Sequence, residues 1–154
     1  METDSPMTVA LLEAERAAAR GEVPVGAVLV DSDSGDILTQ AGNRTEADND
    51  PTAHAEMLVI RQAGANAGVA RLLNADLYVT LEPCAMCAAA ISFARIRRLY
   101  FGAYDPKGGG VEHGARFFQQ ATCHHAPEVI GGVEESRAAT LLKVFFADLR
   151  KRKS

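Results

Sequence analysis

The chain has 154 residues, a hydrophobic content of 47%, a net charge of −4 and three cysteines, and this length predicts one domain, residues 1–154, with a sizeable core. No apolar run approaches the length of a membrane span, and the acidic start, residues 1–4, does not fit a signal peptide. Because so few cysteines are typical of a reducing compartment and not of a disulfide scaffold, we expect a cytoplasmic protein without a membrane partner.

The negative net charge argues against a nucleic-acid partner, but the charges are unevenly distributed. Residues 1–50 carry −8, whereas residues 95–116 carry +3 and residues 138–154 carry +4. A basic middle segment and a basic C-terminal end can hold phosphates locally, in a salt-dependent way. By charge alone, however, a solvated tail at residues 150–153 is the simpler interpretation.

The first elements predicted along the chain are a helix and a hairpin. Ser5 and Pro6 can cap and start a helix that ends at Gly21. Residues 23–30 are β-branched and apolar, and a polar turn at 31–36 leads into a second strand. We expect the helix to be scaffold and the two strands to pair with each other.

Two further helices are predicted at Pro51 and Pro83, because proline at the first helical position loses no useful hydrogen bond. We expect the first of these helices to run from about Thr52. A strand predicted at 76–80 leads to the second helix, which is expected to run from Cys84. The first is expected to bury the apolar residues Met57, Leu58 and Ile60.

The last third of the chain predicts two strands, a glycine-rich loop and a basic helix. Residues 99–102 and 128–133 predict the strands, and the loop at 104–110 contains three successive glycines. From Ser136 a final helix places apolar side chains at helical spacing, which usually means core. These side chains are Leu141, Leu142, Phe145 and Leu149. The end of this helix, about residues 143–154, is basic.

The segment from residue 50 to residue 87 carries the chemistry. Cys84 and Cys87 are three residues apart, so on a helix their sulfurs share one face, and the N-terminal dipole favours the thiolate that zinc requires. With His54 as a third ligand, the fourth position of Zn²⁺ stays open for water, which is typical of a catalytic site. Glu56 is not needed as a ligand and can take a proton and return it to a leaving group. The pattern predicts hydrolytic deamination.

Two other interpretations of the cysteine pair stay open at this point. Cys84 and Cys87 could form a redox pair, or they could belong to a closed structural zinc site. The further ligands of such a site would come from Cys123, His113, His124 or His125. Neither interpretation gives Glu56 a role.

Residues beyond the metal motif resemble the bacterial tRNA-specific adenosine deaminases. The similar segments are residues 23–30, 43–44, 78–84, 95–98 and 101–107, in addition to His-x-Glu and Pro-Cys-x-x-Cys. The resemblance covers nearly the whole chain. The resemblance implies an α/β protein with a cytidine-deaminase-like, three-layer α/β/α fold, in which a five-stranded mixed sheet has helices on both faces.

The resemblance also implies an activity, a cofactor and partners. The reaction would be deamination of adenosine to inosine at the wobble position of a tRNA anticodon loop, from an arginine tRNA, with Glu56 as proton shuttle. One Zn²⁺ per subunit, no organic cofactor and a homodimer are expected. The dimer contacts would come from the alanines at 88–90 and from residues 95–98. Two alternatives remain: a deaminase of free bases or nucleotides of the guanine or cytosine type, and a zinc-stabilised RNA-binding module without catalysis.

The resemblance assigns five substrate-binding residues. Asn43 would hydrogen-bond the target base, and Asp105 and Lys107 would line the channel for the neighbouring nucleotides. Phe145 and Arg150 would approach the anticodon loop, by stacking and by pairing with a phosphate. A Phe145 that simply packs in the core explains its position equally well.

Overall fold

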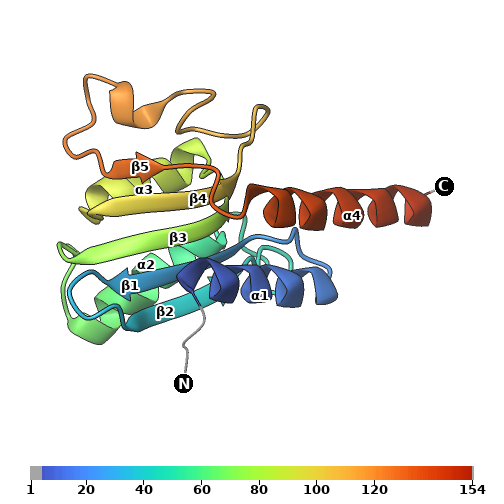
Figure 1. Cartoon of the computed structure of the whole chain (residues 1–154), viewed down its shortest axis with the longest axis horizontal. Coiled ribbons are helices and arrows are strands. Elements are labelled where there is room, and N and C mark those ends of the chain that lie inside the picture. The colour runs from blue at the N-terminus through green and yellow to red at the C-terminus, as the bar shows by residue number, and fades with distance from the viewer. Residues whose placement is uncertain (1–4, 154) are drawn as a thin grey trace.

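The computed structural model describes residues 5–153, and it contains a five-stranded mixed sheet with the strand order β2-β1-β3-β4-β5 (Figure 1). The strands are β1 (Gly26–Asp31), β2 (Ile37–Gly42), β3 (Ala75–Leu81), β4 (Arg98–Ala103) and β5 (Glu128–Ile130). Strand β1 is antiparallel to both β2 and β3, whereas β3, β4 and β5 are parallel. The hairpin predicted for β1 and β2 is confirmed. Residues 1–4, on which the signal-peptide argument depends, and residue 154 lie outside the described range.

Helices cover both faces of the sheet, as predicted (Figure 1). The helices are α1 (Pro6–Ala19), α2 (Ala55–Ala67), α3 (Ala85–Phe93) and α4 (Glu135–Lys153), and a short 3₁₀ turn, η1 (Phe117–Gln119), lies beside α3. Helices α1 and α4 pack on one face, and α2 and α3 pack on the other. Within residues 5–153, none of these helices is long and apolar enough to cross a membrane.

The core has two parts, one on each face of the sheet. The larger part lies under α2 and α3 and includes Leu29, Leu77 and Phe101, all with no exposed surface. The smaller part lies under α1 and α4 and includes Met7 and Val28. Because both faces are covered, the central strands are apolar on both sides, and each fully buried large side chain contributes about 1.5–3 kcal/mol.

Helix α1 begins as the sequence predicts. The Ser5 hydroxyl accepts a hydrogen bond from the Thr8 amide at 3.3 Å, and Pro6 is the first helical residue. After the helix, Gly21 has a φ of +86°, which glycine adopts without strain.

The predicted starts of α2 and α3 are wrong in detail. Helix α2 begins at Ala55 and not at about Thr52, because the Asp50 carboxylate accepts hydrogen bonds from the Thr52 amide and hydroxyl at 2.8 and 2.7 Å and holds a turn there. Pro51 lies in this turn, and Pro83 precedes the cap of α3. As a result, α2 buries Ala55, Glu56, Val59 and Ala63, while Met57, Leu58 and Ile60 are half-buried.

Strand β5 ends at Ile130 and not at residue 133. A side chain at Gly131 would meet Phe101 Cζ at 2.5 Å, so the chain approaches the sheet closely there. Gly132, with a φ of +81°, then turns the chain toward α4. The Val133 amide donates to the Phe101 carbonyl at 3.0 Å and fixes this turn.

Helix α4 extends past the sheet toward the C-terminus, as Figure 1 shows. Its apolar residues are therefore less buried than predicted. Ala138 has 1% of its surface exposed, whereas Leu141, Leu142, Phe145 and Leu149 are half-buried. Phe146 is 40% exposed. The outer part of α4 thus presents aromatic and basic side chains beyond the core.

Candidate active site

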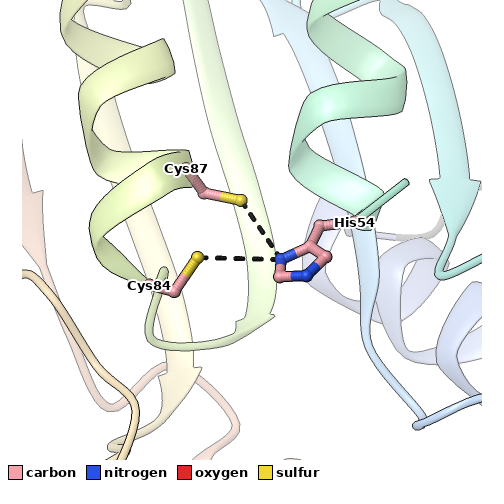
Figure 2. Close-up of side chains that lie close together, drawn as sticks. All are labelled: His54, Cys84 and Cys87. Atoms are coloured by element: carbon pink, nitrogen blue, oxygen red, sulfur yellow. Dashed lines mark hydrogen bonds between the residues drawn. The ribbon is translucent and has the colours of Figure 1, made fainter. Parts of the chain in front are cut away.

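The candidate metal ligands lie where two helices begin. His54 is the N-cap of α2, and Cys84, three residues after the end of β3, is the N-cap of α3. Cys87 follows in the first turn of α3 and is fully buried. Figure 2 shows both sulfurs pointing toward the imidazole of His54. His54 is at the N-cap of α2 and Glu56 is in its first turn. Both side chains can therefore reach the same metal site, because that site lies beyond the N-terminal end of α2.

The three side chains fit a zinc ion. His54 Nδ1 lies 3.7 Å from Cys84 Sγ and 3.5 Å from Cys87 Sγ, and all three ligand atoms lie within 4.8 Å of one another (Figure 2). Tetrahedral zinc with Zn–S of about 2.3 Å and Zn–N of about 2.0 Å would separate nitrogen from sulfur by about 3.5 Å. One imidazole and two thiols are also a donor set that zinc prefers.

The electrostatics of the cluster favour a thiolate. A hydrogen bond from the Cys87 thiol lowers the pKa of Cys84 to about 4, and His54 contributes in the same direction against the effect of burial. The neighbouring Cys84 raises the pKa of Cys87, and burial adds to this effect. Binding of a cation would favour release of the second proton, since metal affinity is coupled to deprotonation of the ligands.

Glu56 lies beside this cluster, in the first turn of α2. Its side chain is buried, with 4% of the residue exposed. Burial raises the pKa of Glu56 to about 7, because the charged form loses solvation, although His54 opposes the shift. A carboxyl group with a pKa near neutrality can both accept and donate a proton at working pH.

Asn43 follows β2 directly and joins the site to α2. Its side-chain oxygen accepts a hydrogen bond from the Ala55 amide at 2.8 Å, at the start of that helix. Its carbonyl accepts one from Arg20 Nη2 at 3.0 Å. Because the side-chain oxygen already has a backbone donor, the amide nitrogen is the group that Asn43 can offer to a ligand.

A cavity and a groove meet at this site. The cavity has a volume of about 300 Å³, and its lining includes Asn43, His54, Glu56 and Cys84. The adjoining groove has a volume of about 770 Å³ and runs between the loop after β4 and helix α4. Val23, Leu81, Asp105 and Gly108 line both. The remaining side chains of the groove are Tyr104, Lys107, Leu142, Lys143, Phe146 and Arg150.

The five predicted substrate-binding residues are therefore not all in one place. Asn43 lines the cavity, Asp105 lines both spaces, and Lys107 and Arg150 line the groove. Phe145 lies instead on a different cavity, between α1 and α4, and its ring packs edge-on against Phe146 at 5.4 Å. The aromatic side chain of α4 on the groove is Phe146, and nothing in the sequence distinguishes it from its neighbour Phe145.

Cys123, His113 and His125, which lie outside the motif, make other contacts, and His124 is exposed. The Cys123 thiol donates to the His125 carbonyl at 3.1 Å, and His125 Nε2 donates to the Ile96 carbonyl at 2.7 Å. His113 contacts Glu82. Among residues 5–153, the group able to hold a metal ion consists of His54, Cys84 and Cys87. This arrangement disfavours the closed structural zinc site.

Comparison with known proteins places the chain in a class. The family model of the cytidine and deoxycytidylate deaminase zinc-binding region matches residues 1–103. The fold and the His-Cys-Cys cluster thus belong to a zinc-dependent deaminase.

Individual relatives are more specific. The tRNA-specific adenosine deaminase of Agrobacterium fabrum is 61% identical over 94% of this chain and 93% of that protein, and the Bacillus subtilis enzyme of the same name is 46% identical over 96% and 90%. A solved structure from studies of A-to-I editing by tRNA:A34 deaminases at the wobble position is 62% identical, with a TM-score of 0.87, over 89% of this chain and 98% of that chain. The chain belongs to the tRNA-specific adenosine deaminase family.

Proposed function

We propose that this protein deaminates adenosine to inosine at the wobble position of a tRNA anticodon loop, and that its substrate is an arginine tRNA. The observation that supports this most is the position of Glu56, buried beside the cluster of His54, Cys84 and Cys87 in a cavity that opens into a groove. Relatives that match along nearly their whole length carry the name of this activity.

In the proposed mechanism, His54, Cys84 and Cys87 would hold zinc, and Glu56 moves the protons. When bound, the zinc ion supplies a Lewis acid that activates water for attack on C6 of adenine. Glu56 accepts a first proton from the attacking water and gives it to the ring nitrogen next to C6. It then accepts the proton of the hydroxyl group now attached to C6 and gives it to the amino group, so that the C6–N bond breaks and ammonia leaves. Asn43 orients the base through its side-chain amide, and burial of Glu56 raises the pKa of its carboxyl group, which favours its taking up a proton.

The groove provides space for the nucleotides beside the target base. A base in a loop is flipped out at lower cost than one in a duplex, so the target can enter the cavity while its neighbours stay in the groove. Tyr104 and Phe146 offer stacking surfaces there, and Lys107, Lys143 and Arg150 offer cations for phosphates.

A matched pair of phenylalanines tests this assignment. Phe146→Ala should raise KM for an anticodon stem-loop about five- to a hundredfold, because base stacking on an aromatic ring contributes about 1–3 kcal/mol. Phe145→Ala should leave KM unchanged and lower stability by about 1–2 kcal/mol, because its half-buried ring lines a separate cavity between α1 and α4. Steady-state kinetics and thermal melting of both variants check this, and the reverse pattern would assign the stacking role to Phe145.

We further propose that residues 1–154 act as one domain in a cytoplasmic homodimer with one zinc ion per subunit. Phe93 on α3 is 71% exposed, and Ala89 and Ala90 on the same helix are half-buried, so this face is available for a second copy. The segment 95–98 is a weaker candidate, because Ile96 is buried in the core of its own chain.

Sedimentation of the zinc-loaded protein at working concentration should give twice the chain mass. A fully active monomer would contradict the dimer. Metal analysis of the same sample measures how many zinc ions each subunit binds. Fractionation of cells tests whether the protein is cytoplasmic.

The function is tested by measuring inosine formation on an arginine-tRNA anticodon stem-loop with zinc-loaded protein, beside free adenosine, guanine and cytosine. Conversion of the wobble adenosine alone is expected. Conversion of a free base alone would instead support the small-molecule deaminase, with the same metal site. Stem-loop binding without any conversion would support the non-catalytic RNA-binding module.

A further inference from the structure

Glu82 is a buried carboxylate that the proposed chemistry does not use. It lies between the end of β3 and the cap of α3, and its side chain has no exposed surface. All five of its hydrogen-bond donors come from one loop, residues 105–113. Oε1 accepts from the Asp105 amide at 3.0 Å and lies 2.8 Å from His113 Nδ1. Oε2 accepts from the amides of Val111, Glu112 and His113 at 3.2, 2.9 and 3.1 Å.

The loop is wrapped tightly around this carboxylate. A side chain at Gly109 would meet Glu82 Oε2 at 2.4 Å, so only glycine fits at that point. The Gly109 amide donates to the Asp105 carbonyl at 2.9 Å, and the Asp105 carboxylate accepts from the Lys107 and Gly108 amides at 3.2 and 2.9 Å. The position of both Asp105 and Lys107 therefore depends on how this loop is held.

The electrostatics agree with an ionised carboxylate at the centre of the loop. Burial by itself would raise the pKa of Glu82, but hydrogen bonds from the Asp105 amide, from His113 and from the neighbouring amides lower it below its usual value. Hydrogen bonds to a charged acceptor are stronger than those to a neutral one. The loop amides that donate to Glu82 have no partners in a helix or a sheet, and the carboxylate takes the place of those partners.

His113 is the one side-chain donor among the five contacts to Glu82. Its imidazole also lies edge-on to the ring of Tyr104, with centroids 6.3 Å apart, and Tyr104 lines the groove. His113 therefore connects the far end of the loop to its beginning, so removal of its side chain should loosen the loop without opening the metal cluster.

We propose that Glu82 and His113 are positioning residues that hold the loop 105–113 in the shape in which Asp105 and Lys107 meet the substrate. This inference rests on the proposed function, because the substrate it concerns is the anticodon loop. Glu82 is in the lining of the cavity, but both of its carboxylate oxygens are hydrogen-bonded to the loop. The effect of Glu82 and His113 on substrate binding is exerted through the loop.

The test compares His113→Leu with His113→Asn. Asparagine can place an amide donor close to the position of Nδ1, whereas leucine fills similar space without any donor. His124→Leu is the matched control, because His124 is exposed on a separate segment. Hydrogen exchange of the peptide covering 105–113, KM and kcat on the stem-loop, and zinc content are measured for each variant.

His113→Leu should speed exchange of the loop amides about tenfold and raise KM by a similar factor, because one hydrogen bond to a buried charge is lost. Its kcat and zinc content should stay within about twofold, and His113→Asn should restore most of both effects. Glu82→Gln should give a larger loss in the same direction, because an amide cannot accept all five hydrogen bonds. The control should match the unsubstituted protein.

Either of two results would overturn the inference: unchanged loop exchange in His113→Leu, or faster exchange with an unchanged KM. Failure of Asn to restore what Leu removes would also contradict it. Failure of the proposed function is separate, because it would appear as absent conversion in the unsubstituted protein, while hydrogen exchange still reports on the loop.

Discussion

Glu56→Gln should bind zinc normally and lose turnover by about 10²–10⁴-fold, the range that a positioned general acid–base group contributes. Glutamine has nearly the same shape as glutamate but can neither accept nor return the proton, and Glu56 is buried beside the candidate ligands, not among them. Zinc content by atomic absorption and inosine formation on the stem-loop measure the two effects in one preparation.

Glu15→Gln is the matched control for Glu56, because Glu15 is an exposed residue of α1. It should leave both zinc and turnover unchanged. Full activity of Glu56→Gln would remove the assigned proton shuttle, and loss of zinc from the same variant would make Glu56 part of the metal site.

Cys87→Ser should lose zinc and, with it, activity. Cys87 is fully buried in the first turn of α3, 3.5 Å from His54 Nδ1, and a serine hydroxyl there does not ionise to replace the thiolate. Because a ligand that binds the folded state stabilises it, a chelator should lower the melting temperature of the unsubstituted protein. The melting temperature of Cys87→Ser should not respond to the chelator.

Cys123→Ser is the control for this experiment. Its thiol donates to a backbone carbonyl, which a serine hydroxyl can also do, and it lies outside the candidate ligand group. Zinc content and activity should therefore be retained. If Cys123→Ser lost zinc as Cys87→Ser does, the metal site would include Cys123 and the catalytic interpretation would be wrong.

The cluster of His54, Cys84 and Cys87 could be predicted from the residues themselves, and the fold class from the resemblance to a known family. His54 and Glu56, and likewise Cys84 and Cys87, lie so close in sequence that local geometry restricts them, and their chemical types already select a metal and a proton carrier. The strands could be recognised because the buried central strands read as continuous apolar runs.

The exact starts of α2 and α3 could not be predicted in the same way. Pro51 favours a helix start, but the hydrogen bonds of the Asp50 side chain hold the chain in a turn there. The first helical residue is therefore Ala55. That small shift decides that His54 caps the helix and faces Cys84 and Cys87.

Only the tertiary structure decided how the groove and its loop are built. Phe145 and Phe146 are neighbours in sequence, but Phe145 lines the cavity between α1 and α4, whereas Phe146 lines the groove. The sequence of α4 alone does not show which ring faces the groove, because this depends on how α4 packs against α1. Glu82 and His113 are separated by 31 positions in the chain, so their contact exists only once β3 and the loop after β4 lie together. The sequence by itself determined which chemical groups the protein has and which local segments carry them. Long-range packing determined which of those groups share a surface, because such contacts depend on the arrangement of whole elements and not on local spacing.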